Sequence, residues 1–85
     1  MTARMHRIYC DGNDRIEIGC YGLWLNKSKE DLAGIPDGPK EGMKVTIYSI
    51  GEFEMEAILE WNAQSNSWAA REIAGTFRPN IEVWD

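Results

Sequence analysis

The sequence has no long hydrophobic run, since its longest uninterrupted aliphatic stretch is Ala57-Ile58-Leu59. A membrane-spanning helix needs about 20 consecutive apolar residues, and a secretory signal needs an apolar segment of roughly 7–15. We therefore expect neither feature. The sequence predicts a soluble, cytoplasmic protein without a membrane partner.

Cysteine and histidine are also scarce. The two cysteines, Cys10 and Cys20, could form one bridge at most, which is too little for a disulfide framework, so we expect reduced thiols. The only histidine, His6, lies four residues before Cys10 in a predicted strand. This spacing separates their alpha carbons by about 13 Å, too far to share a metal ion. No catalytic signature surrounds His6, so we expect no enzyme activity, no metal and no cofactor.

Basic residues are few in the second half of the chain. Residues 1–40 carry six basic and six acidic residues, whereas residues 41–85 carry three basic residues and eight acidic ones. The formal net charge is −5. Nucleic-acid binding normally needs a basic face that displaces counterions, so a nucleic-acid partner is not favoured.

The chain length of 85 residues predicts a single domain over residues 1–85. Its 44% of hydrophobic residues can build a modest core, which makes disorder improbable.

The clearest pattern is a pair of alternating segments, 43–48 and 52–61. Apolar side chains recur at every second position in both segments, which is typical of strands buried on one face. We predict an antiparallel hairpin joined by the loop 49–51, with Gly51 in the left-handed conformation. This loop length predicts the buried pairs Ile47–Phe53, Val45–Met55 and Met43–Ala57.

Two shorter alternating segments, 7–10 and 15–21, predict a second hairpin with Ile8 opposite Ile16. After them, Ser28 is expected to cap one short helical turn.

The prolines and glycines that follow predict a loop over 33–42. Further strands are expected at 68–73 and 81–84.

Several short antiparallel strands in one small domain indicate a mainly β fold, and a barrel removes exposed strand edges economically. Over about 32 residues, the segments 42–48, 53–61 and 68–73 form a pattern that is similar to the strand meander of SH3-like and Tudor-like barrels. The predicted fold is therefore a small antiparallel β-barrel with at most one short helical turn.

The second predicted strand carries most of the acidic excess on one outward face. We predict a non-catalytic protein-interaction module that meets a basic protein partner there. The residues assigned to this binding face are Tyr48, Glu52, Glu54, Glu56, Ile58 and Glu60. The competing explanation is a solvated strand whose charges prevent edge aggregation.

An alternative function is binding of RNA or single-stranded nucleic acid, because aromatic side chains on a small barrel can stack on bases. The basic residues for this role would come from the first half of the chain: Arg4, Arg7, Arg15, Lys27 and Lys29.

Overall fold

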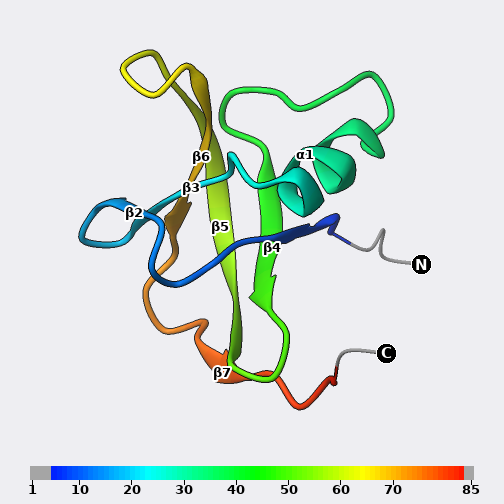
Figure 1. Cartoon of the computed structure of the whole chain (residues 1–85), viewed down its shortest axis with the longest axis vertical. Coiled ribbons are helices and arrows are strands. Elements are labelled where there is room, and N and C mark those ends of the chain that lie inside the picture. The colour runs from blue at the N-terminus through cyan, green and yellow to red at the C-terminus, as the bar shows by residue number, and fades with distance from the viewer. Residues whose placement is uncertain (1–4, 84–85) are drawn as a thin grey trace.

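The computed structural model describes residues 5–83. The elements follow the order β1 (Arg7–Tyr9), β2 (Arg15–Glu17), β3 (Cys20–Gly22), α1 (Asn26–Ala33), β4 (Lys44–Ser49), β5 (Phe53–Asn62), β6 (Ser67–Glu72) and β7 (Arg78–Pro79). Figure 1 shows β4, β5 and β6 as the long strands of the sheet, with β1 and β3 crossing in front of them. The prediction of a mainly β fold is confirmed.

The hairpin β4–β5 is antiparallel as predicted, but its register differs from the prediction by two residues. Val45 lies opposite Ala57 and Ile47 lies opposite Met55, because the loop is 50–52. The Glu52 amide donates to the Ser49 carbonyl at 3.0 Å, which closes the turn one residue later than expected. Since side chains alternate with a period of two, a shift by two leaves each one on its predicted face.

The N-terminal hairpin was predicted wrongly. β1 pairs in parallel with β4, so that Ile8 lies beside Ile47 and not opposite Ile16. The segment 15–21 is no single strand either, because it reverses at Gly19, whose φ is 78°, and divides into β2 and β3. Glycine takes this conformation without the steric cost that a Cβ would bring.

This pairing also leaves the sheet open. Its strand order is β1-β4-β5-β6-β3-β2, with β7 added beside β5, and β1 does not pair with β2 in the part of the chain that the structure describes. The predicted β1–β2 hairpin is the contact that would have joined the two ends of the sheet. The small SH3-like barrel is therefore not confirmed.

The helix α1 has eight residues, which is longer than the single turn expected. Ser28 does not cap it, because Leu25 occupies the cap position. Instead Ser28 is fully buried and its hydroxyl donates to the Tyr9 carbonyl at 2.5 Å. The Tyr9 amide donates to Asp31 at 2.9 Å, so two helix side chains satisfy the outer edge of β1. The helix ends before Gly34 and leads into the predicted loop.

The core lies against one side of the sheet, which we call the inner side. The buried apolar side chains of β4 and β5, which occupy every second position, are directed to this side. Val45, Ile47, Ala57 and Leu59 have no exposed surface. Phe53 and Met55 of β5 and Ala70 of β6 also belong to the core. Further core side chains come from β1, β3 and the region of α1, and include Ile8, Tyr21, Leu23, Leu32 and Ile35. Burying an aliphatic side chain of this size contributes about 1.5–3 kcal/mol, so this face sets the fold.

The closing strand lies earlier than predicted. β7 consists of Arg78 and Pro79, which pair with Glu54 and Phe53, whereas residues 81–83 are outside any strand. Trp84, the last residue of the predicted strand, lies outside the described residues. Among the described strands, β7 pairs with β5 alone, so no strand lies along its other edge. A proline, which has no amide hydrogen to donate, is compatible with such an edge position.

Candidate interaction surface

The residues predicted to form a binding face lie on β4, β5 and the turn between these strands. Glu54, Glu56, Ile58 and Glu60 alternate with the core residues of β5 and are half-buried. They therefore lie on the opposite side of the sheet, which we call the outer face. Glu52 is exposed in the turn, and its carboxylate accepts a hydrogen bond from the Ser49 hydroxyl at 3.2 Å.

Each glutamate of β5 on the outer face is paired with a basic side chain. The nitrogen–oxygen pairs are Arg78–Glu54 at 2.6 Å, Lys44–Glu56 at 2.8 Å and Arg71–Glu60 at 2.9 Å. Arg71 also reaches Glu17 of β2 at 2.7 Å. A further pair, Arg7 with Glu82, joins β1 to the end of the described chain. The outer face is thus crossed by ion pairs that connect different segments.

These pairs largely neutralise the acidic strand. Five carboxylates, those of Glu17, Glu54, Glu56, Glu60 and Glu82, face four cations, those of Arg7, Lys44, Arg71 and Arg78. The hydrogen bond from Arg71 holds the pKa of Glu60 below its usual range. The cations are only loosely held, because the side chains of Lys44, Arg71 and Arg78 are 53%, 46% and 52% exposed. Such exposed pairs contribute about 0–1 kcal/mol each.

Tyr48 does not offer the apolar contact expected of it, because only 6% of it is exposed. The Arg7 guanidinium lies 4.2 Å from the centre of its ring, and Tyr9 packs edge-on against it at 5.8 Å. Its hydroxyl donates to Asp31 of α1 at 3.2 Å. The parallel strand β1 and the helix cover this residue, and neither neighbour was predicted. Ile58 remains as the half-buried apolar side chain of the set.

The two cysteines are buried free thiols in different environments. Cys10 belongs to the core, where burial raises its pKa to about 12. Cys20 faces Glu60 at 3.4 Å, and burial together with this hydrogen bond raises its pKa to about 11. Both thiols are therefore protonated at neutral pH, a state that is neither nucleophilic nor suited to metal binding.

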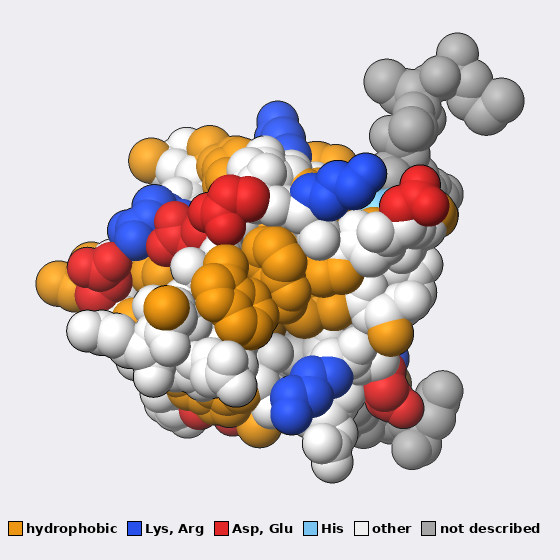
Figure 2. Space-filling model, turned by 90° about the horizontal axis from the view of Figure 1, so that it is seen from above, with side chains coloured by type: hydrophobic (Ala, Val, Ile, Leu, Met, Phe, Trp, Pro, Cys, Tyr) orange, Lys and Arg blue, Asp and Glu red, His pale blue; other side chains and the backbone are white. Residues whose placement is uncertain are grey.

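Trp61 and Trp68 pack against each other at the end of the β5–β6 hairpin. Their rings meet edge to face at 5.5 Å, and Trp61 remains 45% exposed. Figure 2 looks down on this end of the molecule and shows apolar side chains at its centre with charged groups around them. The aromatic pair is worth about 0.5–1.5 kcal/mol beyond the area it buries, so packing alone accounts for it.

Three exposed apolar residues near the end of the chain were missed by the sequence analysis. Phe77 is 64% exposed, Ile81 is 92% exposed and Val83 is 79% exposed. The signal was present, because apolar and polar residues alternate from 77 to 83. Proline is unfavourable within a strand, so the predicted strand began only at residue 81.

The described basic residues of the alternative, nucleic-acid function come from three elements, β1, β2 and α1, and Arg7 and Lys27 both lie near Tyr48. Arg7 is held by Glu82 and Lys27 by Asp31, the latter pair at 3.1 Å. Arg15 lies on β2 and Lys29 on α1. Arg4 lies outside the described residues.

Within residues 5–83 there is no pocket, and no cluster of three or more His, Cys, Asp or Glu side chains is arranged to hold a metal ion. The same residues contain no helix with the length and apolar character needed to span a bilayer.

Comparison of the chain with protein-family models, with curated proteins and with solved structures finds no match. The function proposed below therefore rests on the geometry of this molecule.

Proposed function

We propose that the protein is a non-catalytic protein-interaction module whose outer face binds a basic segment of a partner. The observation that carries this proposal is the row of glutamates on β5, each held by a cation that is about half-exposed. A basic side chain of the partner can replace such a cation, because the two ion pairs have similar energies. The displaced lysine or arginine then returns to solvent.

The spacing of the row favours an extended partner segment. Glu54 and Glu56 are two residues apart on one strand, which separates their alpha carbons by about 7 Å. A partner strand with basic residues at every second position has the same spacing. The half-buried side chain of Ile58 adds apolar contact at the centre of the face.

A peptide with arginine at every second position tests the proposal. We expect binding to weaken as salt rises, because exposed charges are screened over about 8–10 Å at physiological ionic strength. Changing both Glu54→Gln and Glu56→Gln should weaken binding roughly tenfold. The double variant Glu30→Gln with Asp37→Asn is the matched control, since both residues are exposed, lie off the outer face and change the net charge equally, and asparagine tolerates the positive φ of residue 37. Titration calorimetry measures all three proteins.

Equal binding by both double variants would reject the outer face as the site. Urea unfolding provides the stability control, and we expect both variants to stay within about 1 kcal/mol of the wild type. Tight binding of single-stranded RNA at physiological salt, lost on changing Arg7 and Arg15, would favour the nucleic-acid function. The absence of catalysis and a cytoplasmic location remain predictions of the same proposal.

A further inference from the structure

A tryptophan, Trp24, lies on the outer face of the sheet. Trp24 follows β3 in the chain and is half-buried. A Cβ at Gly22 would lie 1.9 Å from an atom of the Trp24 ring, so the ring occupies the space directly over Gly22. In the sheet, Gly22 pairs with Ala69, and Ala69 pairs with Glu60. Paired residues face the same side of a sheet, so the Trp24 ring lies on the same side as Glu60.

The Glu60 carboxylate reaches across β6 to the same part of β3. It accepts a hydrogen bond from the Cys20 thiol at 3.4 Å. Cys20 and Gly22 are two residues apart on β3, which separates their alpha carbons by about 7 Å. Both face the outer side, since Cys20 pairs with Arg71 and Gly22 with Ala69. The ring over Gly22 and the carboxylate beside Cys20 are therefore neighbours.

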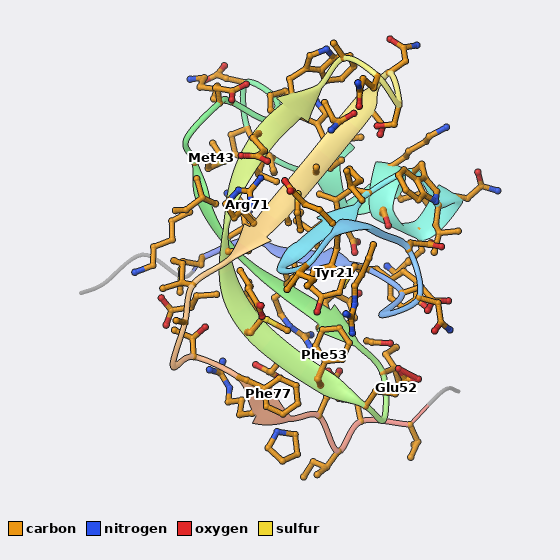
Figure 3. The ribbon with its side chains drawn as sticks, turned by 90° about the vertical axis from the view of Figure 1, so that its left-hand side faces the viewer. Tyr21, Met43, Glu52, Phe53, Arg71 and Phe77 are labelled. Atoms are coloured by element: carbon orange, nitrogen blue, oxygen red, sulfur yellow. The ribbon has the colours of Figure 1, made fainter. Side chains whose placement is uncertain are left out.

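The charges in this region do not balance. Arg71 pairs with Glu60 at 2.9 Å and with Glu17 at 2.7 Å, so one guanidinium serves two carboxylates. Figure 3 shows Arg71 on the side of β6 away from Tyr21, which belongs to the core. One negative charge is left over within this group of three side chains. Arg71 can remain with Glu17 when another cation binds Glu60.

We propose that Trp24 and Glu60 form an anchoring site for one arginine side chain of the partner. This inference rests on the proposed function, and it names the residue type that the outer face selects. A guanidinium is planar, so it can stack on the indole ring while its edge donates hydrogen bonds to the carboxylate. A lysine ammonium is a compact point charge and cannot make both contacts in this way.

The same combination of groups holds an arginine elsewhere in this molecule. The Arg7 guanidinium lies 4.2 Å from the centre of the Tyr48 ring and pairs with the Glu82 carboxylate. The anchoring site offers the same two groups, an aromatic ring and a carboxylate. Tryptophan is the best aromatic partner for a cation, so the contact at Trp24 should be at least as favourable.

The position of the anchoring site fits an extended partner segment. Glu60 is the last glutamate of the row on β5, about 20 Å from Glu54 in an extended strand. A segment of about seven residues spans this distance. Arginines at its other positions reach Glu54 and Glu56, and the arginine at one end reaches the anchoring site.

Titration calorimetry with two peptides of equal length and charge tests the inference. One is the arginine peptide described above, and the other carries lysine at the same positions. We expect the wild type to bind the arginine peptide about fivefold more tightly than the lysine peptide. Trp24→Leu should abolish this preference. Gly22→Ala should do so too, because its added Cβ displaces the ring.

Trp61→Leu is the matched control. Trp61 is 45% exposed and lies on the opposite side of β5 from Glu60, so its loss should leave the preference for arginine unchanged. NMR reads the contact itself: the indole signals of Trp24 should shift when the arginine peptide is added, and those of Trp61 should not. Urea unfolding shows whether each variant is folded.

The outcomes separate this inference from the proposed function. Equal binding of both peptides by the wild type, or a preference for arginine that survives Trp24→Leu, would overturn the anchoring site. The proposed function would then stand or fall on the Glu54→Gln and Glu56→Gln experiment alone. A wild type that binds neither peptide would overturn both.

Discussion

At the scale of single residues, Gly51 shows how the β4–β5 turn is closed. Its φ is 77°, and a Cβ at this position would meet its nearest neighbour, the Glu82 carbonyl, at an ordinary 3.5 Å. A Cβ would therefore fit at position 51, and the positive φ of the backbone is the feature that requires glycine. The left-handed conformation was predicted correctly even though the loop lies one residue later than expected.

We expect Gly51→Val to lower the free energy of unfolding by about 1 kcal/mol or more, because a β-branched residue is strained at positive φ. Gly51→Asn should cost less, since asparagine tolerates this region. Urea unfolding of the three proteins measures the difference. Gly34→Ala serves as the control, since Gly34 has an ordinary φ of −77°. Equal midpoints for all variants at position 51 would contradict the strain argument.

At the scale of elements, α1 protects the exposed edge of β1. Strands at a sheet edge present unpaired amides and carbonyls, which promote aggregation unless another element covers them. Here the Ser28 hydroxyl and the Asp31 carboxylate take the place of a neighbouring strand at Tyr9. The Asp31 carboxylate also accepts a hydrogen bond from the Tyr48 hydroxyl, so the helix is connected to both β1 and β4.

Replacing Ser28 by alanine removes a buried donor to the Tyr9 carbonyl. We expect Ser28→Ala to lower the free energy of unfolding by about 1–3 kcal/mol, the usual cost when a buried polar group loses its partner. Asp31→Ala should speed hydrogen exchange at the Tyr9 amide. Lys29→Ala is the control on the same helix, because Lys29 is exposed. If Ser28→Ala and Lys29→Ala unfold at the same urea concentration, the edge contact contributes nothing.

At the scale of the whole molecule, ion pairs join segments that are distant in sequence. Arg71 links β6 to β2 and β5, Arg78 links β7 to β5, and Arg7 links β1 to Glu82. Hydrogen bonds from Arg71 and Arg7 lower the pKa values of Glu60 and Glu82 respectively. These carboxylates bind protons more readily in the unfolded chain, so their contribution to stability is present above an unfolded pKa of about 4.3.

That contribution is lost as the pH falls through the lower pKa values of the folded state. We therefore expect the urea midpoint of the wild type to decline between about pH 5 and pH 3 more steeply than that of a double variant with Glu60→Gln and Glu82→Gln. Unfolding curves over this pH range give the comparison. Glu30→Gln should retain the wild-type slope, and a double variant with the same slope would show that these pairs do not stabilise the fold.

The geometry of the proposed binding face was predicted in part. The alternation along β5 placed Glu54, Glu56 and Glu60 on the outer face correctly, because a strand directs every second side chain to one side. The ion pair of Glu54 with Arg78 could not be predicted, since Arg78 lies on β7, a strand whose position was not predicted. Tyr48 was misplaced for the same reason, because the elements that cover it come from the other half of the chain.

The sequence by itself determined the mainly β class, the two faces of β4 and β5, the glycine in their turn and the loop after α1. Each of these depends on local periodicity or on the backbone of a single residue. Only the tertiary structure decided that β1 joins β4 in parallel, that the sheet stays open, and that Ile81 and Val83 are exposed. Those outcomes depend on which of several segments, distant from one another in the sequence, pairs with a given strand edge. Ile8 can be buried beside either Ile16 or Ile47, and the contacts of Ser28 and Asp31 with Tyr9 favour the second arrangement.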